Sequence, residues 1–184
     1  GISPAVVEHI KRCTVAFALD LGPNIHPKIL GTGILVNDQG YCITNAHVAR
    51  LLLTPFEYWH TIELSTRSCV LAYQFFSGKG MATITARVNS LLMVKNLEKA
   101  PGKVYYGGTP DLAVFSTDLK GHPFLEISDE LIPPEGTEVY FCGYPLGEAM
   151  FFEEHGLEQV TSLLQRGIIA AHLPFSGIPN PHGF

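Results

Sequence analysis

Short apolar stretches, separated at short intervals by glycine- and proline-bearing turns, constrain the fold of this chain most strongly. Eighteen glycines and 13 prolines are spread over 184 residues. Strand-like patterns are predicted at residues 13–19, 31–36, 41–44, 61–64, 70–76, 81–88, 111–115, 138–145, 158–164 and 166–171. Many short strands joined by tight turns, with little helix, are typical of an all-β barrel or sandwich.

Two short helical segments interrupt this β pattern. Residues 5–12 have helical spacing, with Ser3 as the N-cap and Pro4 at the first helical position. Residues 45–52 form a second, shorter helical turn directly after the strand 41–44. Turns are expected at residues 37–40, 77–80 and 153–154, and an exposed loop at 96–108. Residues 119–135 are irregular and contain prolines, which predicts a linker.

Composition narrows the class of protein and its partners. With 46% hydrophobic and 16% charged residues, the chain is too apolar for intrinsic disorder and long enough for about one domain. It contains no apolar run of about 18 residues, so no membrane insertion is predicted. The net charge is −5 and the 12 Lys and Arg residues are scattered, so no nucleic-acid partner is expected.

The cysteines and histidines give no metal pattern. Cys13, Cys42, Cys69 and Cys142 form neither CxxC nor a zinc spacing, which leaves two disulfides or four free thiols; free thiols are favoured. The histidines show no HxH or HExxH motif, and the glycines of residues 31–33 lack the later glycine of a dinucleotide loop. No metal or cofactor is therefore predicted. The expected free thiols and the lack of a signal-peptide pattern favour a cytoplasmic location.

Two residues could carry acid–base chemistry. His47 lies just past the end of a strand, beside the small Ala46, on a backbone rigid enough for a general base. Asp111 opens the apolar strand 111–115, and a carboxylate drawn into such a setting needs a partner such as an imidazole N–H. Taken singly, each residue has an ordinary structural interpretation.

Five segments, in order, give the chain a specific resemblance. They are GTGILV, YCITNAHV, PDLAVF, FCGYPLG and RGIIAA, and they extend from about Cys13 to Ala171. Together they resemble the trypsin-like serine peptidases, especially the compact bacterial, HtrA-like branch. The resemblance implies two antiparallel six-stranded β-barrels with a cleft between them, His47 as general base and Asp111 as the residue that orients its ring. The spacing of 64 positions from His47 to Asp111 is long for the compact branch, and residues 53–60 and 96–108 would be insertions. The disulfide that brackets the base in secreted relatives could not form, since no cysteine closely follows His47.

The serine nucleophile, the third member of this family's catalytic triad beside the histidine and the aspartate, has no clear counterpart in this chain. In this family the nucleophile follows the aspartate in a Gly-Asn/Asp-Ser-Gly-Gly segment, and none occurs after Asp111. Ser116 is too close to Asp111, and Ser128 and Ser162 lack the glycines of an oxyanion hole. Ser176, before Gly177, is the nearest imitation, and Cys142 is interpreted as a buried core thiol.

The resemblance therefore implies a serine endopeptidase domain, a hydrolase acting on protein or peptide substrates, whose nucleophile segment is missing from this chain. Residues 1–118 would hold the helix and first barrel, 119–135 the linker, and 136–184 part of a second barrel. We expect the isolated chain to be inactive and prone to aggregate at an unpaired edge. Two alternatives stay open: a non-catalytic binding module on the same scaffold, and a cysteine peptidase of the same fold.

Overall fold

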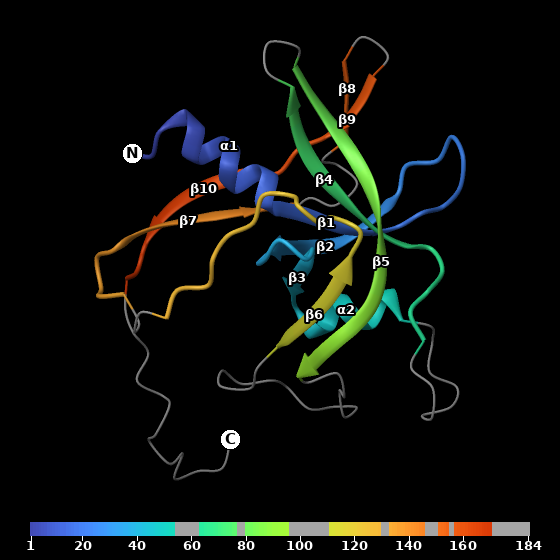
Figure 1. Cartoon of the computed structure of the whole chain (residues 1–184). Coiled ribbons are helices and arrows are strands. Elements are labelled where there is room, and N and C mark those ends of the chain that lie inside the picture. The colour runs from blue at the N-terminus through green and yellow to red at the C-terminus, as the bar shows by residue number, and fades with distance from the viewer. Residues whose placement is uncertain are drawn as a thin grey trace.

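The structure, a computed structural model, describes residues 1–53, 63–76, 80–95, 111–129, 133–145, 151–154 and 157–170 (Figure 1). Two helices and ten strands follow one another in these residues: α1 (Pro4–Cys13), β1 (Thr14–Leu19), β2 (Lys28–Leu35), β3 (Tyr41–Thr44), α2 (Ala46–Leu52), β4 (Ser68–Phe76), β5 (Gly80–Lys95), β6 (Leu112–Thr117), β7 (Glu138–Gly143), β8 (Phe151–Glu154), β9 (Leu157–Val160) and β10 (Leu163–Ile168).

Six of the strands close into an antiparallel barrel in the order β1-β2-β3-β6-β5-β4. Outside the barrel, β7 pairs with β10 and β8 pairs with β9, each pair antiparallel. The predicted all-β class, the first six-stranded barrel and the short N-terminal helix are confirmed. As predicted, Ser3 accepts a hydrogen bond from the backbone N–H of Val6 at 3.3 Å, and Pro4 opens α1.

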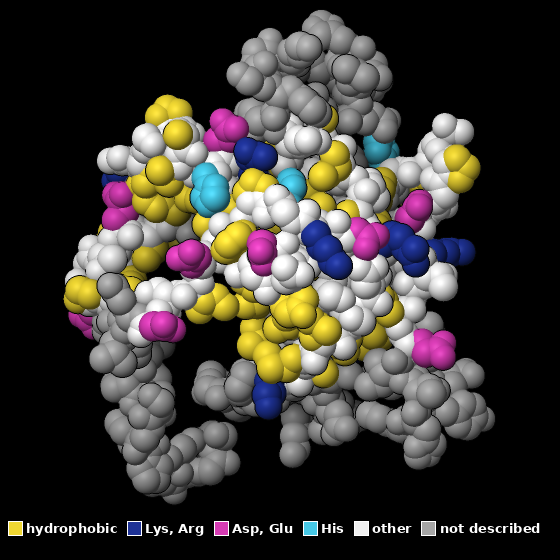
Figure 2. All heavy atoms as spheres, viewed as in Figure 1, with side chains coloured by type: hydrophobic (Ala, Val, Ile, Leu, Met, Phe, Trp, Pro, Cys, Tyr) yellow, Lys and Arg dark blue, Asp and Glu magenta, His cyan; other side chains and the backbone are white. Residues whose placement is uncertain are grey.

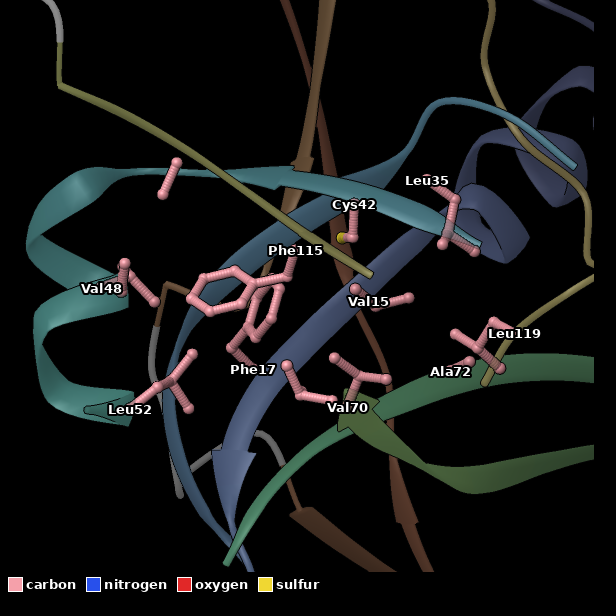
Figure 3. Close-up of a cluster of buried hydrophobic side chains, with 13 residues drawn as sticks. Val15, Phe17, Leu35, Cys42, Val48, Leu52, Val70, Ala72, Phe115 and Leu119 are labelled. Carbon is pink, nitrogen blue, oxygen red and sulfur yellow. The ribbon is translucent and has the colours of Figure 1, made fainter. Parts of the chain in front are cut away.

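The core of the barrel is built around two aromatic rings and closed at one end by α2. The rings of Phe17 on β1 and Phe115 on β6 lie 5.3 Å apart, tilted by 49°. Val48 and Leu52 of α2 point toward these rings (Figure 3). Because this face of α2 is buried, packing as well as local preference holds the short helix in place.

Two glycines of β2 let neighbouring side chains approach its backbone closely. A Cβ atom at Gly31 would lie 2.5 Å from Cγ2 of Val48, and one at Gly33 would lie 2.4 Å from the ring of Phe17. Carbon atoms pack at about 3.5–4.0 Å, so neither position accommodates a side chain without movement. These glycines therefore serve packing against α2 and β1.

The C-terminal strands differ from the predicted ones. The predicted strands 158–164 and 166–171 are replaced by β9 and β10, with a break at Thr161 and Ser162, and β8 includes the predicted turn at 153–154. Both residues at the break bind Lys11 of α1: its ammonium donates to the Thr161 hydroxyl at 3.4 Å and to the Ser162 carbonyl at 2.9 Å. Such a tertiary contact is invisible to a pattern of alternating side chains. Of the segments predicted from the sequence, residues 54–62, 77–79, 96–108, 130–132 and 171 lie outside the described part.

Residues 119–129 and 133–137, within the predicted linker region and at its end, contain no helix or strand. The first of these segments runs along the barrel, where the N–H of Leu125 donates to the carbonyl of Leu35 at 2.9 Å. The His122 ring donates through Nε2 to the carbonyl of Arg12 at 3.0 Å. These contacts tie the segment to both β2 and the end of α1.

All four cysteines are free thiols in this structure. Cys13, Cys42 and Cys69 are buried, and burial raises the pKa of Cys13 and of Cys69 to about 11 each and that of Cys42 further. Cys142 is only partly buried, contrary to its prediction as a buried core thiol, and its sulfur donates to Oγ of Ser162 at 3.3 Å. The raised pKa values make the thiols of Cys13, Cys42 and Cys69 poor nucleophiles near neutral pH.

Candidate active site

His47 lies in the first turn of α2, where the chain leaves β3. The pairing of β3 with β6 ends at Thr44 opposite Ala113, so the residues that follow Thr44 lie beside the residues that precede Ala113. This register brings Asp111, which directly precedes β6, to the start of α2. Sequence positions 64 residues apart thereby meet at the end of the barrel that α2 covers (Figure 1).

The side chains of His47 and Asp111 are in direct contact. Nδ1 of the His47 ring lies 2.6 Å from Oδ2 of Asp111, and the backbone N–H of His47 donates to Oδ1 at 3.0 Å. One carboxylate thus holds both the ring and the backbone of the same residue. This double contact fixes the direction of the imidazole more firmly than a single hydrogen bond does.

Asp111 also completes the first turn of α2. The backbone N–H groups at a helix start have no partners within the helix, and a carboxylate there is favoured by their partial positive charge. Partial burial works to raise the pKa of Asp111, but hydrogen bonds from the ring and backbone of His47, the imidazole charge, and the N–H of Ala46 outweigh it. The pKa of Asp111 therefore lies below its ordinary value, and the carboxylate is ionised at neutral pH.

An ionised carboxylate accepts hydrogen bonds and cannot donate them. Nδ1 of His47 must therefore carry the proton that points at Asp111, and the other nitrogen, Nε2, is the acceptor in the neutral ring. The His47 side chain is 63% exposed and that of Asp111 is 42% exposed. The ring is therefore held at one nitrogen and open to an incoming group, as a general base requires.

The structure describes three of the serines that follow Asp111, and no hydrogen bond between any of them and His47 is found among the described residues. Ser116 shares a hydrogen bond with Oγ of Ser90 at 2.6 Å on the β5–β6 ladder, and Ser162 is fully buried. Ser128 is exposed in the segment after β6. Ser176 lies outside the described residues. The structure thus brings His47 and Asp111 together and adds no described serine to them.

Two further residues near this pair escaped sequence reasoning. The Thr44 hydroxyl donates to the carbonyl of Thr32 at 2.6 Å, and the Thr32 hydroxyl accepts from the backbone N–H of Tyr144 at 2.9 Å. Gly143 approaches so closely that a Cβ there would lie 2.8 Å from Oγ1 of Thr32. Thr32 therefore links the strand that leads to His47 with the end of β7. No local pattern marks a threonine for such a long-range role.

The second residue that sequence reasoning missed is Asn45, between β3 and α2. Its side-chain amide donates through Nδ2 to the backbone carbonyl of Asp111 at 3.2 Å. An asparagine directly before a helix ordinarily signals an N-cap, so its sequence position gave no hint of a contact with Asp111.

Away from this pair, an open hollow of about 600 Å³ lies between α1 and the segment after β6. Its lining includes His9, Asp38, His122 and Glu126, but neither His47 nor Asp111. Within the described part of the chain, no three His, Cys, Asp or Glu side chains are grouped as a metal site would need. Nor is any described helix long and apolar enough to span a bilayer.

Charged side chains are distributed over the face seen in Figure 2, where Lys and Arg lie interspersed with Asp and Glu.

Comparison with known proteins identifies the family of this chain. The family model described as a trypsin-like peptidase domain matches residues 31–181, most of the chain. The chain therefore belongs to the trypsin-like peptidase family, and the predicted resemblance is confirmed.

No curated protein matches the chain. Among solved structures, the chain is similar to the MamO protease domain from Magnetospirillum magneticum, in its apo form, at 16% identity and a TM-score of 0.44. The similarity covers 89% of this chain and 62% of that one, so the chain spans less than two thirds of the MamO domain.

Proposed function

We propose that this chain carries the general base and the orienting carboxylate of a serine endopeptidase. The observation that supports this is the contact of 2.6 Å between Nδ1 of His47 and Oδ2 of Asp111, on a chain of the trypsin-like peptidase family. The substrates would be proteins or peptides. The pair would serve acyl transfer, in which a hydroxyl must lose its proton as it attacks a carbonyl carbon.

In this proposal Nε2 of His47 accepts the proton of a serine hydroxyl while the serine oxygen bonds to the scissile carbonyl carbon. The imidazolium then donates that proton to the departing amine, and the peptide C–N bond breaks. Asp111 keeps the proton of the neutral ring on Nδ1 and stabilises the positive charge that forms. The nucleophile is a serine that the described residues do not include.

The chain of residues 1–184 by itself is expected not to hydrolyse peptide bonds. Its sequence contains no Gly-Asn/Asp-Ser-Gly-Gly segment, and Ser116 and Ser162 are engaged or buried elsewhere. Casein hydrolysis by this chain, abolished by His47→Ala, would contradict this expectation and would point to Ser176.

The proposed function is tested on the natural protein that contains these residues. Casein hydrolysis should be present in that protein and lost in His47→Ala, because no other group replaces the base. His26→Ala, an exchange at an exposed histidine of the β1–β2 connection, is the matched control and should retain hydrolysis. A natural protein that folds but cleaves neither casein nor peptides would overturn the proposal in favour of a binding module. Loss of hydrolysis with a thiol-selective alkylator would instead indicate a cysteine nucleophile.

A further inference from the structure

Asn45 occupies the N-cap position of α2 but does not cap the helix. Its backbone has the extended conformation of an N-cap, with φ −80° and ψ 147°, yet its side chain makes no capping hydrogen bond. Instead, Nδ2 of Asn45 donates to the backbone carbonyl of Asp111 at 3.2 Å. Asparagine is among the best N-cap residues, so the use of its side chain elsewhere calls for a reason.

The reason lies in an exchange of partners across the barrel end. Oδ1 of Asp111 accepts the N–H of His47 at 3.0 Å, which is the contact that an N-cap side chain would make. The helix start is therefore satisfied by Asp111, and the amide of Asn45 is free to hold the backbone of Asp111.

This hold matters because Asp111 lies outside the strand ladder. The β3–β6 pairing ends at Thr44 opposite Ala113, two residues beyond Asp111. The carboxylate must nevertheless stay at 2.6 Å from Nδ1 of His47. The hydrogen bond from Asn45 to the backbone carbonyl of Asp111 restrains the backbone from which the carboxylate side chain extends.

We propose that Asn45 is a positioning residue for the Asp111–His47 pair, an inference that rests on the proposed function of that pair. Its amide holds the carbonyl of Asp111, Asp111 holds Nδ1–H of His47, and Nε2 is thereby kept as the acceptor. The alternative is that Asn45 only stabilises the start of α2.

The test measures the tautomer of the His47 ring in the full 184-residue chain by nitrogen-15 NMR, at a pH where the ring is neutral. Signals of His47 are assigned by their loss in His47→Gln. In Asn45→Ala the ratio of the Nδ1–H to the Nε2–H form should fall about threefold to tenfold, as expected when one charge-assisted hydrogen bond weakens. Asp111→Asn provides the reference for complete loss of the carboxylate's influence.

Asn45→Ser separates positioning from capping. Serine is an equally good N-cap, so it preserves the helix start, but its hydroxyl is too short to reach the carbonyl of Asp111. The proposal requires that Asn45→Ser fold with a thermal midpoint no lower than that of Asn45→Ala and still lose the Nδ1–H preference. An unchanged tautomer ratio in Asn45→Ser would overturn it, and this variant decides the matter if Asn45→Ala fails to fold.

The two proposals can fail separately, because the tautomer measurement needs no peptidase activity. If the Asn45 variants change the tautomer ratio but the natural protein hydrolyses no substrate, the positioning role of Asn45 is supported and the proposed peptidase function is refuted. Hydrolysis that depends on His47, with an unchanged tautomer in Asn45→Ser, would remove only the role of Asn45.

Discussion

The contact between Gly31 and α2 gives the sharpest prediction about the scaffold of the site. A Cβ at Gly31 would lie 2.5, 3.0 and 3.3 Å from Cγ2, Cγ1 and Cβ of Val48. Gly31→Ala therefore requires a shift of about 1 Å to reach ordinary carbon contacts. Valine is stiff about χ1 in a helix, so its methyl groups cannot turn aside, and α2 itself must move.

The change in the free energy of unfolding that Gly31→Ala should cause is the difference between two opposing effects. Without a clash, replacing glycine by alanine in extended backbone would stabilise the fold by about 0.4–1 kcal/mol, chiefly through the unfolded chain. Overpacking a dense core costs about 1–3 kcal/mol. We expect Gly31→Ala to lower the free energy of unfolding by about 1–2 kcal/mol, the overpacking cost minus that gain.

A double-mutant cycle with Val48→Ala tests the cause. Val48 is 3% exposed, and Val48→Ala alone should cost about 2–3 kcal/mol through lost burial and the cavity left behind. Because that exchange removes the clashing methyl groups, the double variant should be more stable than additivity predicts by at least about 1 kcal/mol.

Urea unfolding followed by circular dichroism measures all four proteins, and unchanged m-values confirm that only stability differs. Gly167→Ala is the matched control: it lies on β10, where the nearest atom at 3.2 Å belongs to the exposed ring of Phe141, which can move aside. The control should be within about 0.5 kcal/mol of the wild type. Additive effects of Gly31→Ala and Val48→Ala, or a Gly31→Ala variant as stable as the wild type, would refute the packing argument.

Three further predictions concern Asp111, His122 and Thr32. Asp111→Asn should lower the free energy of unfolding by about 0.5–1 kcal/mol at pH 7, because the exposed amide still accepts an N–H but lacks the charge at the helix start. Since the pKa of Asp111 is lowered from 3.8 in the folded chain, the difference between variant and wild type should vanish as the pH falls through the folded-state pKa. Urea unfolding measures this difference, and a difference that stays constant with pH would contradict the prediction. Half-burial lowers the pKa of His122 from 6.5, so the unfolded chain takes up the proton first and the free energy of unfolding falls as the pH drops below 6.5. Between pH 7.5 and 5.5, His122→Gln should lose less stability in urea unfolding than the wild type does. An equal loss in both proteins would exclude His122 as the cause. Thr32→Val removes the acceptor of the Tyr144 N–H and should lower the free energy of unfolding by about 1–2 kcal/mol in thermal unfolding. Thr32→Ser keeps the hydroxyl and should lower it less. Equal losses of stability in the two variants would assign the effect to packing.

Local patterns were enough to predict most of the first barrel. The Ser3-Pro4 start of α1 and the hairpin that joins β2 to β3 rest on short-range rules, and both are present in the structure. Alternation was less informative after β7, where one predicted strand proved to be β9, a break and the start of β10. There the residues of the break, Thr161 and Ser162, bind Lys11, which lies 150 positions away from Thr161, and no local pattern records such a contact.

The candidate site divides in the same way. By itself the sequence determined the identity and order of the segments around His47 and Asp111, because strands, turns and helix starts depend on neighbouring residues. Only the tertiary structure decided that Asp111 completes the first turn of α2, that Asn45 holds the carbonyl of Asp111, and that Thr32 reaches Tyr144. Each of these contacts joins residues more than 60 positions apart. The register of β3 against β6 brings Asp111 to Asn45 and His47, and the contact of Thr32 with Tyr144 joins the barrel to the end of β7.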